Sequence, residues 1–168
     1  FVMRAVDNGV GRIRIFDALN DVRNMETSIK ASKEAGAHVQ GAFVYTISPY
    51  HKVSDFVKIA KDLASLGVDS ICIKDMSGLL APYVAYDLVK ELKAAVDLPI
   101  QLHTHYTSGM ASMTYLKAVE AGVDIIDTAL SPFAMGTSQP ATEALVAAFQ
   151  GTSYDTGLDL EKLYTLSD

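Results

Sequence analysis

The sequence has little cysteine, no long apolar run and no cluster of basic residues, and each shortage excludes a class of protein. The single cysteine, Cys72, rules out a disulfide framework and suits a reducing compartment. No apolar run approaches the roughly 20 residues needed to cross a bilayer, and the first residues lack the features of a secretory signal. The net charge is −6 and the 14 Lys and Arg residues are dispersed, which argues against a nucleic-acid partner. We therefore expect a cytoplasmic protein.

The 168 residues are 49% hydrophobic and 20% charged, a balance that suits one globular unit, and we assign residues 1–168 to a single domain. Short apolar runs rich in β-branched residues alternate with amphipathic segments of about 12–16 residues. This alternation is typical of β/α units. The runs predict strands at Arg12–Phe16, His38–Thr46, Ser70–Ile73, Ile100–Leu102 and Asp124–Thr128.

The amphipathic segments have the 3.6-residue period of helices. Pro82 stands where a first-turn proline is tolerated. Three segments are followed by Gly36, Gly67 and Gly122, each suited to the left-handed position that commonly ends a helix. Helices are predicted at Asp21–Ala35, Val53–Leu66, Pro82–Val96, Ala111–Ala121 and Ala141–Phe149, with the end of a further helix at Val2–Asn8.

The strands recur at about 25–30 residues, the size of one β/α unit, and lack strict polar alternation, as expected for a parallel sheet. The fold class is therefore α/β. A closed (β/α)8 barrel needs eight strands and typically about 250 residues. We predict a partial (β/α)8 TIM barrel, about the last five β/α units. The alternative is a five-stranded doubly wound sheet, although no dinucleotide-binding glycine motif is present.

Three residues that can bind a metal stand at the ends of two predicted strands. Lys74 ends an apolar run, and His103 and His105 are two residues apart, so both imidazoles can point to the same side of a strand. Active sites of β/α barrels lie at the carboxyl ends of their strands. Separately, the lysine could be a salt-bridged residue and the histidines a hydrogen-bonded pair. Together they predict a metal site.

Other polar residues near the strand ends are weaker candidates. A carboxylate there can orient a metal ligand or cap a loop, and both interpretations apply to Asp17, Asp75 and Asp127. Thr137 fits a helix N-cap ahead of Pro140, or an active-site hydroxyl on the same rim as the histidines. We expect packing or exposed positions for the remaining histidines and the tyrosines of this rim: His38, His51, Tyr45, Tyr50 and Tyr106.

Four motifs, in order, resemble the carboxyltransferase domain of biotin-dependent enzymes. They are Phe16–Asp21, Ile73–Met76, Leu102–Gly109 and Gly136–Pro140, and the resemblance covers essentially the whole chain. It is greatest to the α subunit of oxaloacetate decarboxylase and the B subunit of pyruvate carboxylase, which the sequence does not separate. The same family includes the corresponding subunit of transcarboxylase.

This resemblance implies a divalent metal (zinc, manganese or cobalt) at the mouth of the barrel. Its ligands would be His103, His105 and Lys74, the last after CO2 has added to the amine to give a carbamate. The resemblance also implies that Lys74 and Thr137 are catalytic, with Thr137 contacting biotin and moving a proton. The implied reaction transfers a carboxyl group between carboxybiotin and a 2-oxo acid, pyruvate or oxaloacetate. Biotin would arrive on a separate carrier domain, because no Met-Lys-Met biotinylation motif is present.

Some family features fall outside this sequence. The fourth metal ligand, an aspartate, and the arginine and glutamine that bind the keto acid belong to strands that would precede Phe1, so we expect an enzyme whose activity is absent from this segment alone. Tyr106 replaces an aspartate of some pyruvate carboxylases. The alternatives are another metal-dependent aldolase or lyase of the same barrel superfamily, such as a hydroxymethylglutaryl-CoA lyase or isopropylmalate synthase relative, or an inactive association module. Exposed sheet edges predict a homo-oligomer, and membrane decarboxylase subunits are candidate partners.

Overall fold

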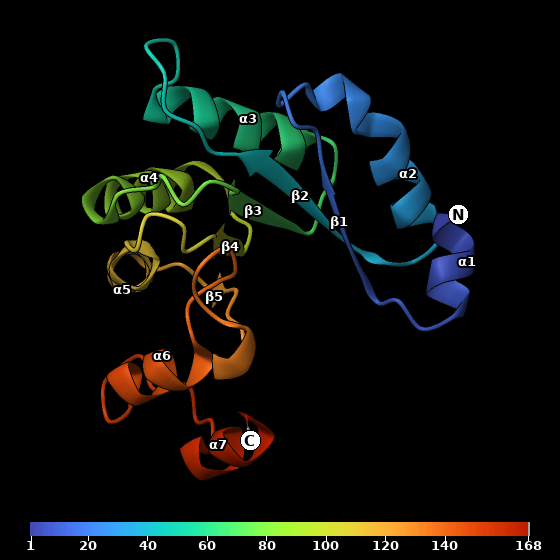
Figure 1. Ribbon diagram of the computed structural model, residues 1–168. Coiled ribbons are helices and arrows are strands. Elements are labelled where there is room, and N and C mark those ends of the chain that lie inside the picture. Colours follow the sequence, from blue (N-terminus) through green and yellow to red (C-terminus); the bar gives the residue numbers. More distant parts are fainter. Residues whose placement is uncertain (168) are drawn as a thin grey trace.

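The computed structural model describes residues 1–167 and contains one sheet of five parallel strands (Figure 1). The strands are paired in chain order, with no reversal. All five predicted strands are found, although their ends differ from the prediction. They are β1 (Arg12–Phe16), β2 (His38–Val44), β3 (Ser70–Asp75), β4 (Ile100–Thr104) and β5 (Ile125–Ile126).

The predicted helices are also found. Gly122 has φ +98° at the end of its helix, as expected for a left-handed C-terminal residue. The helix predicted at Asp21–Ala35 is divided, because the carboxylate of Asp21 accepts the amide of Arg23 and starts a separate 3-10 turn, η1. The α-helices are α1 (Val2–Asp7), α2 (Glu26–Glu34), α3 (Val53–Ser65), α4 (Pro82–Ala95), α5 (Ala111–Ala121), α6 (Thr142–Phe149) and α7 (Leu160–Ser167), of which α7 was not predicted; the 3-10 turns are η1 (Val22–Asn24) and η2 (Ser131–Phe133).

The order of the strands decides between the two predicted architectures. A doubly wound sheet reverses its strand order at a switch point and carries helices on both faces. Here the order is sequential, and the helices that connect the strands lie on the outer side of a curved sheet (Figure 1). This is the arrangement of consecutive β/α units in a barrel. Within residues 1–167, no helix has the length and apolar character of a membrane span.

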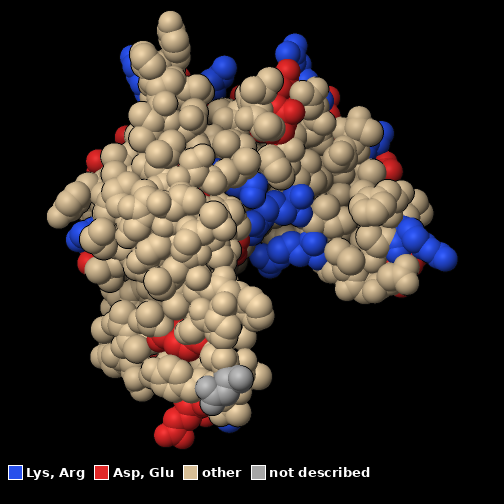
Figure 2. Space-filling model, in the orientation of Figure 1, with Lys and Arg blue, Asp and Glu red and all other residues tan. Residues whose placement is uncertain are grey.

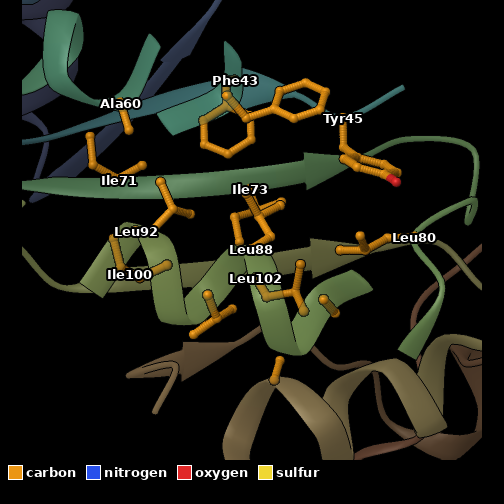
Figure 3. Packing of buried hydrophobic residues seen from close by; sticks show 14 of the residues in the cluster. Phe43, Tyr45, Ala60, Ile71, Ile73, Leu80, Leu88, Leu92, Ile100 and Leu102 are labelled. Carbon is orange, nitrogen blue, oxygen red and sulfur yellow. The ribbon is translucent and has the colours of Figure 1, made fainter. Parts of the chain in front are cut away.

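The hydrophobic core lies between the outer face of the sheet and the helices (Figure 3). Alternate residues of each strand point outward, so Ile71 and Ile73 of β3 and Leu102 of β4 meet Leu88 and Leu92 of α4. These five side chains are all fully buried. Burying each one stabilises the fold by about 1.5–3 kcal/mol. The other residues of each strand line the inner face.

Candidate metal centre

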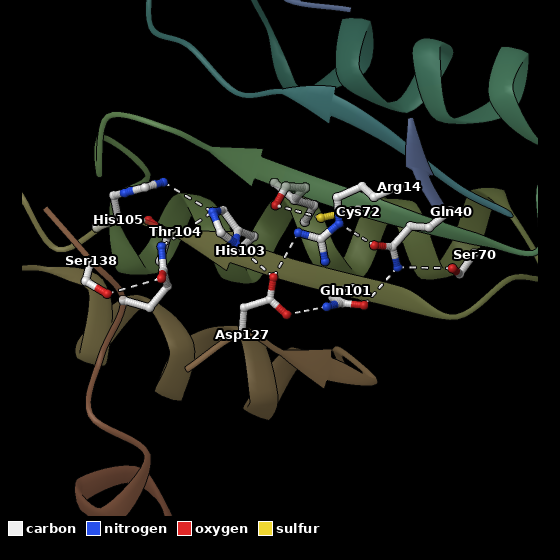
Figure 4. A network of polar contacts seen from close by, with 12 residues as sticks. Arg14, Gln40, Ser70, Cys72, Gln101, His103, Thr104, His105, Asp127 and Ser138 are labelled. Atoms are coloured by element: carbon white, nitrogen blue, oxygen red, sulfur yellow. Dashed lines mark hydrogen bonds and ion pairs between the residues drawn. The ribbon is translucent and has the colours of Figure 1, made fainter. Parts of the chain in front are cut away.

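The inner face of the sheet carries a network of polar side chains from four strands and from the segment after β5 (Figure 4). Arg14 lies opposite Gln40 across β1 and β2, and Lys74 lies opposite His103 across β3 and β4. Paired residues of parallel strands point to the same face of the sheet. The register therefore brings Lys74 and His103 to adjacent positions at the carboxyl edge, as the sequence predicted.

His103 and His105 face each other with Nε2 atoms 3.2 Å apart. Each imidazole uses its other nitrogen for a contact with an oxygen that can only accept. Nδ1 of His103 lies 2.8 Å from Oδ2 of Asp127, and Nδ1 of His105 lies 2.5 Å from the carbonyl oxygen of Thr137. Both Nδ1 atoms therefore donate, and in the neutral imidazoles both Nε2 atoms carry lone pairs.

Two facing lone pairs suit a bound cation. Ligand distances of 2.0–2.1 Å around a tetrahedral zinc ion place two imidazole nitrogens about 3.3 Å apart, close to the observed 3.2 Å. The hydrogen bond at each Nδ1 is the outer contact typical of metal-binding histidines. Within residues 1–167, no three His, Cys, Asp or Glu side chains are grouped to hold a metal. The histidine pair thus supplies two nitrogen donors, with Lys74 paired beside them.

Lys74 is half-buried, and its Nζ lies 5.0 Å from the centre of the Phe16 ring. This is a cation–π contact, which stabilises the ammonium form. An ammonium has no lone pair and cannot bind a metal, whereas a carbamate formed by CO2 at the neutral amine is an anionic oxygen donor. The position of Lys74 beside His103 fits the predicted role as a metal ligand. To bind a metal, the amine would have to move away from the Phe16 ring.

Asp127 is the carboxylate that orients His103. Burial by itself would raise the pKa of Asp127, but hydrogen bonds from His103, Arg14 and Gln101, together with the charge of Arg14, lower it to about 2. Asp127 is therefore ionised at neutral pH. A charged carboxylate keeps the His103 proton on Nδ1, which leaves Nε2 directed at His105.

Asp75 points to the opposite face from Lys74 and is fully buried. Its carboxylate accepts the amides of Leu79 and Leu80 at 3.0 and 2.9 Å and the hydroxyl of Thr104 at 2.6 Å. Asp75 thus anchors the loop after β3, and the capping interpretation is confirmed. Asp17 has the same kind of role after β1, since it accepts the amides of Leu19 and Asp21 and the side chain of Asn24.

The loops after β3, β4 and β5 are packed on one another at the carboxyl edge. Thr107 donates to the carbonyl of Ser77 at 2.6 Å, and Ser108 donates to the carbonyl of Gly78 at 2.5 Å. The amide of Tyr106 donates to the carbonyl of Ser138 at 2.8 Å. These bonds hold His105 between two neighbouring loops.

Thr137 lies in the third of these loops and is exposed. Its contact with the histidine pair is made by the main-chain carbonyl, which accepts from His105. The structure therefore brings Thr137 to the site. A catalytic hydroxyl at this residue stays a prediction.

The other weak candidates have structural positions. His38 lies at the opposite end of the sheet, with Nε2 2.8 Å from the hydroxyl of Ser70. Tyr45 is buried against Phe56, and the exposed His51 ring stacks on Phe56 as well. Tyr50 is exposed and Tyr106 is half-buried in its loop. Burial raises the pKa of the Cys72 thiol to about 12, so this thiol stays protonated.

Sequence reasoning missed two features that position the site. Arg14 was included in an apolar run, although it forms an ion pair with Asp127 at 2.9 Å. Tyr115 of α5 was not singled out, although its hydroxyl donates to the carbonyl of Asp127 at 2.6 Å and accepts the amide of Thr104 at 3.1 Å. The hydroxyl of Tyr115 thus joins β4 to the segment after β5, just beyond Leu102 and Ile126, the last paired residues of β4 and β5. The alternation Arg-x-Arg in β1 was the one available signal for Arg14.

The sequential parallel sheet and the paired histidines at its carboxyl edge define a segment of a β/α barrel with a candidate metal site. A family model described as HMGL-like matches residues 4–168, and the chain belongs to this family. It is 61% identical to the B subunit of pyruvate carboxylase from Methanocaldococcus jannaschii over the whole of this chain and 30% of that protein. It is 44% identical to the methylmalonyl-CoA carboxyltransferase 5S subunit of Propionibacterium freudenreichii subsp. shermanii over the whole of this chain and 34% of that protein.

Among solved structures, the chain superposes on the carboxyl transferase domain of Rhizobium etli pyruvate carboxylase with a TM-score of 0.97 and 39% identity. The match covers 99% of this chain and 29% of that one. The chain thus spans about 30% of the length of the relatives it matches. The comparisons confirm both the resemblance to the carboxyltransferase domain and the partial barrel.

Proposed function

We propose that this chain is part of a biotin-dependent carboxyltransferase that moves a carboxyl group between carboxybiotin and a 2-oxo acid, pyruvate or oxaloacetate. Because the chain spans about 30% of its relatives, the activity belongs to the full-length protein. The Rhizobium etli domain has been solved with pyruvate and biocytin, which supports this pair of ligands. The observation that carries the proposal is the Nε2–Nε2 distance of 3.2 Å between His103 and His105.

In this proposal His103, His105 and carboxylated Lys74 hold a divalent metal, with zinc, manganese and cobalt as candidates. When bound, such an ion supplies a Lewis acid that polarises the keto acid and stabilises negative charge. The inner face adds positive charge from the chain itself, since Arg12, Arg14 and Lys74 project from it. Figure 2 shows basic side chains gathered in the hollow of the molecule. This charge favours an anionic substrate, although the protein as a whole is acidic.

The partners in this proposal are a biotin carrier domain and a second copy of the protein. A relative from Hydrogenobacter thermophilus is the large subunit of a 2-oxoglutarate carboxylase, which is 44% identical. The class of substrate, a 2-oxo acid, is therefore better supported than the choice of pyruvate. A cytoplasmic location remains part of the proposal, and it rests on the single buried cysteine.

Metal analysis and avidin inhibition of the full-length protein test the assignment together. We expect about one divalent ion per chain and conversion of oxaloacetate that avidin blocks, because avidin sequesters biotin. A His103→Ala variant should lose most of the metal, since it removes one of two facing donors. Metal-dependent cleavage that avidin leaves unchanged would instead support the aldolase or lyase alternative. A protein that binds no metal would contradict the site.

A Thr137→Val variant tests the predicted role of the hydroxyl. Valine keeps the main-chain carbonyl that accepts from His105, so we expect the variant to bind metal as the wild type does. Carboxyl transfer should then fall if the hydroxyl moves a proton, typically by 10²–10⁴-fold. Unchanged transfer with unchanged metal would restrict Thr137 to its carbonyl contact.

A further inference from the structure

Arg14 lies in β1, at one edge of the sheet, and Asp127 directly follows β5, at the other edge. The two side chains nevertheless form an ion pair, with Nη1 2.9 Å from Oδ2. Four steps between neighbouring strands of a flat sheet would separate β1 from β5 by roughly 19 Å. The arginine and aspartate side chains together do not reach across that distance. The contact forms because the sheet is curved, so that Arg14 crosses the inner face toward Asp127 (Figure 4).

We infer that Arg14 is a positioning residue for the candidate metal ligand His103 and that it acts through Asp127. The inference rests on the proposed metal site. Both residues contact the same oxygen of Asp127. Oδ2 accepts a hydrogen bond from Nη1 of Arg14 at 2.9 Å and one from Nδ1 of His103 at 2.8 Å. The guanidinium thus fixes the atom that in turn fixes the imidazole.

A second path joins Arg14 to the other oxygen of the same carboxylate. Nε of Arg14 donates to Oε1 of Gln40 at 2.6 Å, and Nε2 of Gln40 donates to Oε1 of Gln101 at 2.8 Å. Nε2 of Gln101 then donates to Oδ1 of Asp127. The four side chains form a closed ring in which every amide orientation is determined by its neighbours. Both carboxylate oxygens are held, so Asp127 cannot rotate without breaking the ring.

The geometry of arginine is needed for this arrangement. A guanidinium presents several N–H groups in a rigid planar fork, so one side chain can donate to Gln40 and Asp127 in fixed directions. A lysine ammonium has the same charge but is a single point at the end of a flexible chain. The side chains of Arg14 and Asp127 are 27% and 25% exposed. Because this ion pair is partly buried, its loss should lower folding stability as well as change His103, so the effect at His103 has to be measured in folded variants.

Binding of Co²⁺ to the full-length protein, freed of metal beforehand, tests the inference. Arg14→Met should weaken Co²⁺ binding about 10-fold, and Asp127→Asn by 10–100-fold, the range for residues that orient metal-binding histidines. Arg14→Lys should fall between Arg14→Met and the wild type. The double variant Arg14→Met/Asp127→Asn should bind no more weakly than Asp127→Asn alone, because both changes act through one carboxylate. Arg12→Met is the control, since exposed Arg12 lies on the same strand and face.

The tautomer of His103 gives a second readout, which a purely structural role would not change. Nitrogen NMR of the metal-free wild type should show the proton on Nδ1, and Arg14→Met should show a mixture of tautomers. If Arg14→Met fails to fold, Arg14→Lys provides the same comparison. Unchanged Co²⁺ affinity and unchanged tautomer in a folded Arg14 variant would overturn the inference, even with a lower melting temperature. A wild type that binds no Co²⁺ but keeps the expected tautomers would contradict the metal site and leave the positioning of His103 supported.

Discussion

Replacing Lys74 with alanine is expected to abolish carboxyl transfer, with a loss of at least about 10³-fold. Lys74 is paired with His103 on the neighbouring strand and points to the same face. Removing the side chain deletes the only group at this position that can become an anionic oxygen donor by reaction with CO2. Transfer assays and metal analysis of the full-length Lys74→Ala protein measure both consequences. Lys58→Met, on the exposed side of α3, is the matched control.

Small-molecule rescue distinguishes a carbamate from a free amine at Lys74. The space left by Lys74→Ala can admit acetate, whose carboxylate has the charge and shape of the carbamate group, or methylamine, which resembles the original amine. We expect acetate to restore part of the metal content and of the transfer rate, and methylamine to restore neither. Rescue by methylamine alone, in buffer freed of CO2 so that methylamine forms no carbamate, would show that Lys74 acts as an amine. Full activity of the unsupplemented variant would remove Lys74 from the reaction.

Conversion of Lys74 to the carbamate would also remove its cation–π contact with Phe16. The ammonium form is stabilised by the Phe16 ring, a contact worth about 0.5–2 kcal/mol. A carbamate is negatively charged and gains nothing from the face of an aromatic ring. In the proposed site, a bound metal would have to offset the loss of this contact. The proposal thus gives Lys74 one favourable contact for each charge: the Phe16 ring for the ammonium and the metal for the carbamate.

A Gly78→Ala variant should lose about 2–5 kcal/mol of folding stability and most of its metal affinity. Gly78 has φ +65°, where a side chain costs roughly 1–2 kcal/mol. Its added Cβ would also lie 2.5 Å from the carbonyl oxygen of His105 and 2.8 Å from Oγ1 of Thr107. Relief of this overlap costs about 1–3 kcal/mol more and displaces the loop that carries His105. Chemical denaturation and Co²⁺ titration measure the two effects.

Gly36→Ala is the control for backbone strain. Gly36 has φ +79°, similar to Gly78, but a Cβ there would meet no atom within 4 Å. It should therefore show the conformational cost alone and leave metal binding unchanged. The difference between the two variants isolates the overlap with His105 and Thr107. Equal losses of stability, with intact metal binding in both, would contradict the packing of the loops at the carboxyl edge.

The architecture and the placement of Lys74, His103 and His105 at one edge of the sheet could be predicted because both depend on local patterns. Apolar runs, helical periods and helix-ending glycines place the elements, and residues at strand ends of a barrel meet at one edge. The side of the sheet on which Asp75 lies could also have been predicted from the sequence. Asp75 follows Lys74 directly, so alternation along the strand already places it on the opposite face, away from the candidate metal site.

The positioning residues could not be predicted in the same way. Buried parallel strands are expected to be apolar throughout, and Arg12–Phe16 was assigned on that basis, whereas Arg14 lies on a polar inner face. Linking Arg14 to Asp127 needs the curvature of the sheet, and linking Asp127 to His103 needs the register of β4 and β5. Neither quantity is encoded in a short stretch of residues. Both result from how five strands pack against the helices.

Tyr115 carries a consequence for how changes outside the sheet affect the site. Its hydroxyl bridges the amide of Thr104 and the carbonyl of Asp127 beyond the last ladder pair of β4 and β5. The link between these two segments is therefore made by a side chain from the helical layer. A change in α5 that moves Tyr115 would thus reach both His103 and its partner Asp127 through the main chain, without touching the inner face of the sheet.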